Sequence, residues 1–269
     1  MRALASSVLA LTVVSACAGS TASPTPTPLS DPKQILTQSL VNLGQAKSFH
    51  GAGTIAGSVD MNGLSSLGGS SSLGLTGTLD LKGGTIGGDV DVSRQAAHLT
   101  VSFPSLFGLA VDLIEVDGYS YTKINLMSDK YTRSRTDVGA IASAVPSAGA
   151  DVGGAVAGLQ QLLDGSGTTA TLAGHSTIEG KDCYRLNLAI PTDQLNAGLQ
   201  SLAPSLSGNP GLDSASAVYW VYGDTLRPAQ MELKASSASL GNVDVTATLT
   251  RYDQSVSITA PPADQVEAQ

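Results

Sequence analysis

The chain has 269 residues, of which 42% are hydrophobic, 4% aromatic and 13% charged, with 14 basic and 22 acidic residues and a net charge of −8. This acidic balance, without a basic patch, argues against nucleic acid as a partner and against electrostatic docking on anionic lipid headgroups. Only two cysteines are present, so the chain is not a disulfide-framed secreted domain.

The N-terminus has the pattern of a secretory signal peptide. Arg2 is followed by an apolar run over residues 3–14, which is too short to span a bilayer but is typical of the core of a signal peptide. Positions 14–17 read Val-Ser-Ala-Cys and resemble the lipobox of bacterial lipoprotein precursors. The resemblance implies that residues 1–16 are removed and that the Cys17 thiol is acylated. The alternative is a chance cysteine after an ordinary signal peptide.

The lipidated cysteine and a tether are predicted over residues 17–30. This segment is rich in proline, serine and threonine, has nothing to bury, and should be an extended spacer between membrane and domain. A single folded domain is expected over residues 31–262, with residues 263–269 as a C-terminal tail.

The domain is predicted to begin with a helix and to continue in strands. Asp31 and Pro32 form a helix start, and Leu36, Leu40 and Leu43 repeat at helical spacing. Apolar and polar residues then alternate, which indicates strands with one face turned inward. Such strands are expected at 75–81, 90–92, 99–103, 109–116 and 119–124, with a long Gly-rich loop at 62–74.

The second half of the domain is predicted to mix helices with strands. Apolar residues recur at helical spacing over 138–145, 152–163 and 195–202. Alternation returns in several other segments, which are expected to be strands: 171–190, 217–222, 229–235, 243–251 and 255–259. Strands joined by hairpins, with helices gathered in a few places, indicate an α+β domain in which helices cover one face of an antiparallel sheet.

Several motifs, taken in order, make the domain resemble a known family. Residues 116–121 read Val-Asp-Gly-Tyr-Ser-Tyr, and residues 178–186 read Ile-Glu-Gly-Lys-Asp-Cys-Tyr-Arg-Leu. Trp220 follows, and the chain ends with Leu-Thr-Arg-Tyr at 249–252 and two prolines at 261–262. After a lipobox, a tether and a first helix, this order resembles the LppX/LprA/LprF/LprG family of actinobacterial lipoproteins. The resemblance covers nearly all of the domain.

The resemblance implies a fold and a function. The family folds as a strongly curved antiparallel β half-barrel, similar to the periplasmic carrier LolA, with helices that cover the concave face and enclose an apolar cavity. The cavity would hold the acyl chains of a lipid, glycolipid or lipoglycan. The protein would carry this cargo between membrane layers and would need no cofactor. The protein would be exported and anchored through Cys17 on the outer face of the plasma membrane, with a membrane lipid exporter as a possible partner.

The lipid-binding residues are expected at the inward positions of the strands and helices. With few aromatic rings to fill a wide curved sheet, small aliphatic side chains would line a dry pocket suited to acyl chains. The alternative is a packed core without cargo, in a non-enzymatic surface or interaction lipoprotein. The candidate lining residues are Leu75, Leu79, Val90, Leu99, Val101, Leu109, Val111, Leu113, Ile124, Leu159 and Leu163.

No pattern favours an enzyme, and we expect no catalytic residues. Ser120 and Lys123 match the Ser-x-x-Lys motif of penicillin-binding proteins. That pair meets only on a helix, whereas residues three apart on the strand predicted here point to opposite faces. His50, His98 and His175 lack a second ligand at short spacing, so they are expected to be surface or strand-edge histidines and not a metal site.

Two further side chains have alternative roles. Cys183 has no cysteine left to pair with once Cys17 is acylated, and its apolar strand pattern predicts a buried, inert thiol instead of a reactive one. Trp220 could stack on a sugar but is expected in the core.

Overall fold

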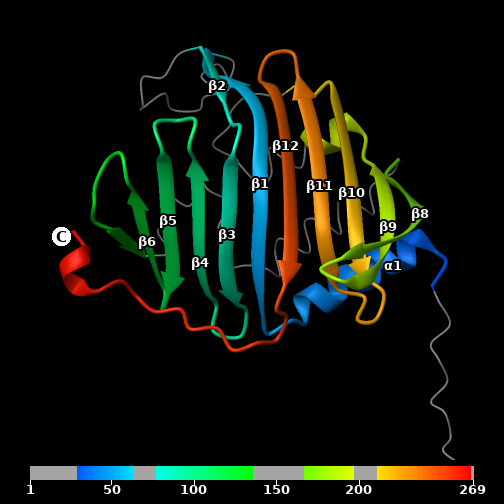
Figure 1. Cartoon of the computed structure of the whole chain (residues 1–269), viewed down its shortest axis with the longest axis horizontal. Helices are drawn as coiled ribbons and strands as arrows, with labels where there is room; N and C mark the ends of the chain where they lie inside the picture. The colour runs from blue at the N-terminus through cyan, green and yellow to red at the C-terminus, as the bar shows by residue number, and fades with distance from the viewer. Residues whose placement is uncertain (1–28, 63–76, 136–166, 197–210, 268–269) are drawn as a thin grey trace, which may run out of the picture.

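The computed structural model describes residues 29–62, 77–135, 167–196 and 211–267. Their strands form one antiparallel sheet in the order β7-β6-β5-β4-β3-β1-β12-β11-β10-β9-β8, with β2 paired on β1 (Figure 1). The sheet is not closed, because β7 and β8 lie at opposite edges. Its elements are α1 (Pro32–Gly44), β1 (Ser48–Asp60), β2 (Thr78–Asp80), β3 (Gly84–Asp91), β4 (Ala96–Phe103), β5 (Leu109–Val116), β6 (Tyr119–Ile124), β7 (Thr132–Arg135), β8 (Thr169–Ile178), β9 (Lys181–Ala189), β10 (Ser214–Tyr222), β11 (Pro228–Ser237), β12 (Gly241–Thr250) and a 3-10 turn, η1 (Ala263–Gln265).

The helix α1 begins where the sequence predicts. The Asp31 carboxylate accepts a hydrogen bond from the Lys33 amide at 3.0 Å, and Pro32 stands at the first helical position. Proline loses no hydrogen bond there, and its fixed φ suits the first turn. Ile35, Leu36 and Leu40 are buried on one side of the helix, and α1 contacts β8, β10 and β11. None of the helices in the described segments is long and apolar enough to cross a membrane.

Two of the motifs that carry the family resemblance form tight hairpin turns. Asp117 and Gly118 have φ of 54° and 75° between β5 and β6, and Glu179 and Gly180 have φ of 50° and 76° between β8 and β9. Positive φ at both central residues is the geometry that matches the twist of the flanking strands, and glycine adopts it without steric cost. The Asp-Gly and Glu-Gly pairs between strand segments therefore fix both hairpins.

The centre of the sheet is rich in glycine, which the alternation pattern did not reveal. No strand was predicted over most of β1 and β3, because their glycines interrupt any apolar repeat. At Gly53 a Cβ atom would lie 2.3 Å from the carbonyl oxygen of Thr246, and at Gly88 it would lie 2.1 Å from that of His98. Only glycine allows such close approach of backbones, so these residues let the sheet bend between its two ends.

The prediction of a last strand at residues 255–259 is wrong. The chain after β12 runs without strand pairing as far as η1, and Tyr131 and Val266 form an isolated bridge. Residues 251–267, the C-terminal segment, lie along the lower edge of the sheet in Figure 1. Ile258 is buried there and Val256 packs beside it, so their alternation reflects burial against the sheet instead of hydrogen bonding within it. A C-terminal tail was predicted at residues 263–269. Its described part, residues 263–267, belongs to the same contact, because Val266 forms the bridge with Tyr131.

Several predictions fall on residues that the structure does not describe. They are the signal peptide and tether, most of the Gly-rich loop, and the helices at 138–145 and 152–163. Of the helix predicted at 195–202, only the start is described, where residues 192–196 are helical. The described residues confirm an α+β chain built on a curved antiparallel sheet, while the helices expected to enclose a cavity stay a prediction.

Candidate lipid-binding face

Six of the predicted lipid-binding residues lie together on one face of the sheet. Residues paired across antiparallel strands point to the same side. Val101 on β4 pairs with Val111 on β5, which pairs with Ile124 on β6. On the same strands, Leu99 pairs with Leu113 and Phe103 pairs with Leu109. Positions two apart on a strand share a face, so the register gathers these side chains into one aliphatic surface.

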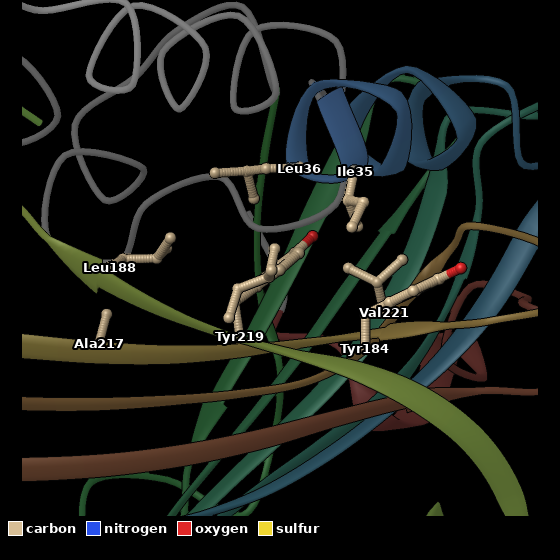
Figure 2. Close-up of a cluster of buried hydrophobic side chains, with 8 residues drawn as sticks. Ile35, Leu36, Tyr184, Leu188, Ala217, Tyr219 and Val221 are labelled. Atoms are coloured by element: carbon tan, nitrogen blue, oxygen red, sulfur yellow. The ribbon is translucent and has the colours of Figure 1, made fainter. Parts of the chain in front are cut away.

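This face is the one that α1 covers at the other end of the sheet. Val101 also pairs with Ile86 of β3, and the same row continues through β1, β12, β11 and β10 to Leu186 of β9. Leu186 belongs to a buried cluster in which α1 contributes Ile35 and Leu36. Figure 2 shows these helix residues above side chains from β9 and β10, among them Tyr219 and Val221. We call this side of the sheet the inner face.

The two ends of the inner face differ in burial. Under α1, Leu186 and Val221 are 0% exposed. On β3–β6 the inner face is buried at Val90 and Ala97, whereas its other aliphatic side chains are only half-buried. The half-buried set comprises Ile86, Leu99, Val101, Phe103, Leu109, Val111, Leu113 and Ile124.

Between these ends, the inner face carries glycine at several positions of β1 and β3, beside the aliphatic side chains of Ile55, Val245 and Leu249. Gly88 pairs with both Gly51 and Leu99, and Gly53 pairs with both Ile86 and Ala247. Neighbouring side chains lie over these glycines, because a Cβ atom would stand 2.7 Å from Leu99 at Gly88 and 3.1 Å from Ile86 at Gly53.

The remaining predicted lining residues do not belong to this half-buried set. Val90 is buried between Phe49 and Ala97 on the inner face. Leu79 is half-buried on the short strand β2, where it pairs with Val59. Leu75, Leu159, Leu163 and the lipidation site Cys17 lie outside the described residues.

Sequence reasoning missed two members of the half-buried set. Phe103 continues the alternation of Leu99 and Val101, and that signal was available in the sequence. Ile86 lies among glycines at 83, 84, 87 and 88, so no apolar repeat marks it, and only pairing with Val101 identifies its face.

The opposite, outer face is polar over the centre of the sheet. Thr54 of β1 pairs with Thr246 of β12, and Thr100 of β4 pairs with Asp112 of β5. Two hollows of about 540 and 390 Å³ lie on this outer side, the larger one between Tyr222, Arg227 and Tyr252 and the smaller one beside Thr54 and Thr246. Neither is the apolar cavity that the family resemblance implies, which stays a prediction.

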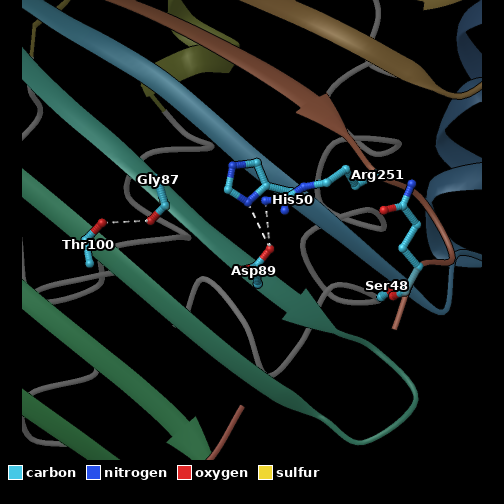
Figure 3. Close-up of polar contacts among 7 residues, drawn as sticks. Ser48, His50, Gly87, Asp89, Thr100 and Arg251 are labelled. Atoms are coloured by element: carbon cyan, nitrogen blue, oxygen red, sulfur yellow. Dashed lines mark hydrogen bonds and ion pairs between the residues drawn. The ribbon is translucent and has the colours of Figure 1, made fainter. Parts of the chain in front are cut away.

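The three histidines lie on strands, and each contacts one aspartate. His50 Nδ1 lies 2.9 Å from Asp89, His98 Nε2 lies 2.8 Å from Asp112, and His175 Nδ1 lies 3.0 Å from Asp182. Figure 3 shows the first pair with Arg251 beside it, at 3.4 Å from the same carboxylate. The described residues contain no group of three side chains that could hold a metal ion.

The Ser-x-x-Lys pattern does not form a nucleophile site. Ser120 and Lys123 lie on β6, where Ser120 pairs with Glu115 and Lys123 pairs with Asp112 on the other face. The prediction that the two side chains point apart is confirmed. Lys123 Nζ instead lies 4.8 Å from the centre of the Tyr131 ring.

Cys183 and Trp220 are both buried, as predicted. They belong to a cluster on the outer side of the sheet with Tyr222 and Ala229. Burial raises the pKa of the Cys183 thiol, which disfavours the reactive thiolate.

Comparison with known proteins identifies the fold. The lipoprotein LppX of Mycobacterium tuberculosis is 19% identical with a TM-score of 0.51, over 86% of this chain and 100% of that chain. LprF of Mycobacterium bovis is 18% identical with a TM-score of 0.51, over 87% of this chain and 99% of that chain. No family model matches the chain, and no curated protein sequence does either. The chain therefore has the fold of LppX and LprF, as the order of its motifs predicted.

Proposed function

We propose that this protein binds the acyl chains of a lipid, glycolipid or lipoglycan on its inner face and carries them between membrane layers. One observation supports this most directly. The half-buried set of β3–β6 lies in register on the inner face, whereas Leu186 and Val221 on the same face under α1 are 0% exposed. An apolar surface that stays partly exposed favours an apolar ligand.

The chemistry of this surface suits an acyl chain. Its members are leucine, isoleucine and valine with a single phenylalanine, Phe103, and they present no charge to a ligand. Each methylene that an acyl chain buries there contributes about 0.8 kcal/mol. Binding of this kind needs no cofactor and no catalytic residue.

The envelope location belongs to the same proposal. The lipobox at Cys17 and the Pro/Ser/Thr-rich tether would hold the domain above the outer face of the plasma membrane, since two or three acyl chains anchor a protein firmly. LppX, which shares the fold, is itself a lipoprotein. The proposed partner that supplies the cargo is a membrane lipid exporter.

Lipid extraction from the purified protein tests the proposal. The chain from position 17 with Cys17→Ser, exported from its native host behind an ordinary signal peptide, would be extracted and its lipids identified by mass spectrometry. We expect one recurring lipid class at about one molecule per chain. A lipid-free protein that also fails to bind a fluorescent fatty acid would contradict the proposal and favour an interaction lipoprotein with a packed core.

A pair of tryptophan substitutions locates the site. Val101→Trp would place an indole on the inner face and displace cargo, whereas Thr100→Trp would place one on the outer face of the same strand. We expect the first variant to lose most of its lipid and the second to retain it, with both folded by circular dichroism. Equal lipid content in the two variants would exclude β4 from the site.

A further inference from the structure

Three large apolar side chains are exposed at one end of the sheet. Phe107 is 91% exposed, Met127 70% and Leu126 54%, and the next most exposed in the described residues is Val41 on α1, at 36%. Single exposed apolar side chains are common, but several gathered in one place mark a contact surface. We call Phe107, Leu126 and Met127 the apolar tip.

The apolar tip stands on two loops that are bonded to each other. Phe107 lies in the loop between β4 and β5, and the other two side chains lie in the loop between β6 and β7. The Asn125 side chain joins the loops, because its Nδ2 donates to the Gly108 carbonyl at 2.8 Å and its Oδ1 accepts from the Ala110 amide at 2.8 Å. The three side chains are thus presented as a unit.

The first loop holds its phenylalanine outward in a fixed conformation. Phe107 has a φ of 55°, a left-handed conformation that costs energy for a residue with a bulky side chain. The turn is closed by hydrogen bonds from the Leu106 amide to the Phe103 carbonyl at 3.0 Å and from the Gly108 amide to the Pro104 carbonyl at 3.2 Å. The exposed ring therefore belongs to a defined turn.

The apolar tip continues the inner face at its rim. Phe103 and Leu109, which pair across β4 and β5, flank the first loop, and Ile124 ends β6 directly before the second. In Figure 1 these loops lie at the upper left, whereas α1, into which the predicted tether leads, lies at the lower right. The tip is therefore at the opposite end of the sheet from α1.

We propose that the apolar tip inserts into a lipid surface and docks the β4–β7 end of the protein on it. A lipid surface fits better than a protein groove, because the side chains stand on protruding loop ends instead of a flat apolar face. Aromatic and aliphatic side chains on such loops partition into the headgroup region of a bilayer by hydrophobic burial. The inference goes beyond cargo binding: it names a docking surface, and it holds whether or not the inner face carries lipid.

Sedimentation with phosphatidylcholine vesicles tests the docking. The chain from position 17 with Cys17→Ser keeps every described residue and removes the predicted acyl anchor. We expect it to bind the vesicles, Phe107→Ser to lower the partition coefficient about tenfold, and the combined serine variant of all three tip residues to abolish binding. Val41→Ser, the matched exposed residue on α1, should change binding by less than about twofold.

A fluorescent variant gives a second readout. Phe107→Trp keeps a large ring at the tip, and its emission should shift to the blue when vesicles are added, whereas the native Trp220 is buried and should not respond. Absence of vesicle binding by the parent chain, or equal losses in Phe107→Ser and Val41→Ser, would overturn the proposal. So would dimers that dissociate in Phe107→Ser, because the tip would then be a contact between copies.

Lipid content of the same variants separates this inference from the proposed function. Phe107→Ser should retain its cargo by mass spectrometry while it loses vesicle binding. Loss of vesicle binding with unchanged cargo supports docking at the tip, whereas a cargo-free parent chain that still binds vesicles would contradict only the cargo proposal.

Discussion

The two ends of the sheet differ in how far they bury the inner face. At the β8–β11 end, α1 packs on the inner face and fully buries Leu186 and Val221. At the β4–β6 end, the described buried cluster lies on the outer face, where the C-terminal segment brings Ile258 against Ile114 and Val116. The second end thus has a core on the outer face, and on its inner face only Val90 and Ala97 are buried among the aliphatic side chains. This arrangement leaves the half-buried set partly exposed without loss of the fold, which is what a binding surface requires.

The largest expected effect distinguishes leucines at the two ends. Leu186→Ala removes a fully buried side chain under α1 and should lower the free energy of unfolding by about 2–5 kcal/mol. Leu113→Ala, on the half-buried inner face of β5, should cost about 1 kcal/mol or less in lipid-free protein. Urea denaturation of both variants measures the difference. Equal losses would show that the inner face of β5 is a packed core.

The outer core of the second end can be tested through the C-terminal segment. Ile258→Ala should lower the free energy of unfolding by about 2–3 kcal/mol, because Ile258 is buried against Ile114 and Val116. Val256→Ala removes a half-buried neighbour in the same segment and should cost less than about 1 kcal/mol. Thermal denaturation compares the two. A negligible effect of Ile258→Ala would mean that this end is stabilised by its inner face after all.

Glycine allows the sheet to bend between its two ends, so alanine substitutions at two neighbouring glycines of β3 should differ in their effect on stability. Gly88→Ala places a Cβ atom 2.1 Å from the His98 carbonyl oxygen and should destabilise the protein by about 1–3 kcal/mol. Gly87→Ala, at the next position of β3, meets nothing closer than 3.8 Å and should change stability by less than about 1 kcal/mol. Denaturant midpoints of the pair measure the effect. A harmless Gly88→Ala would remove the steric reason for the bend.

The smallest effect concerns a tyrosine under α1. Burial raises the pKa of Tyr219 from its usual 10.0 to about 12, and its hydroxyl lies 3.2 Å from that of Ser39. A raised pKa means that the folded state keeps the proton longer, so this stabilising contribution is present below pH 10 and is lost between about pH 10 and 12. Tyr219→Phe should cost about 1 kcal/mol at neutral pH.

Because the phenylalanine cannot ionise, that difference should shrink or reverse as the pH rises to about 12. Stability curves of both proteins against pH provide the measurement. A constant difference across the range would contradict burial of the Tyr219 hydroxyl at this end.

Local patterns in the sequence determined much of the fold and of the candidate face. Asp31 and Pro32 fixed the start of α1, and the paired turn residues at 117–118 and 179–180 fixed two hairpins, because their backbone chemistry acts within a few residues. The alternation of Leu99, Val101 and Phe103 placed them on one face for the same reason. The order of the motifs was enough to predict the fold shared with LppX and LprF.

Tertiary structure alone decided the rest, because it depends on residues far apart in the chain. The glycine-rich strands β1 and β3 have no apolar repeat and became visible only through pairing with β12 and β4. Ile86 joins the candidate face through its partner Val101 and not through its neighbours. Val256 and Ile258 alternate like a strand, yet they pack on a sheet without joining it. Alternation records which side of a segment is buried, and only the fold decides what buries it.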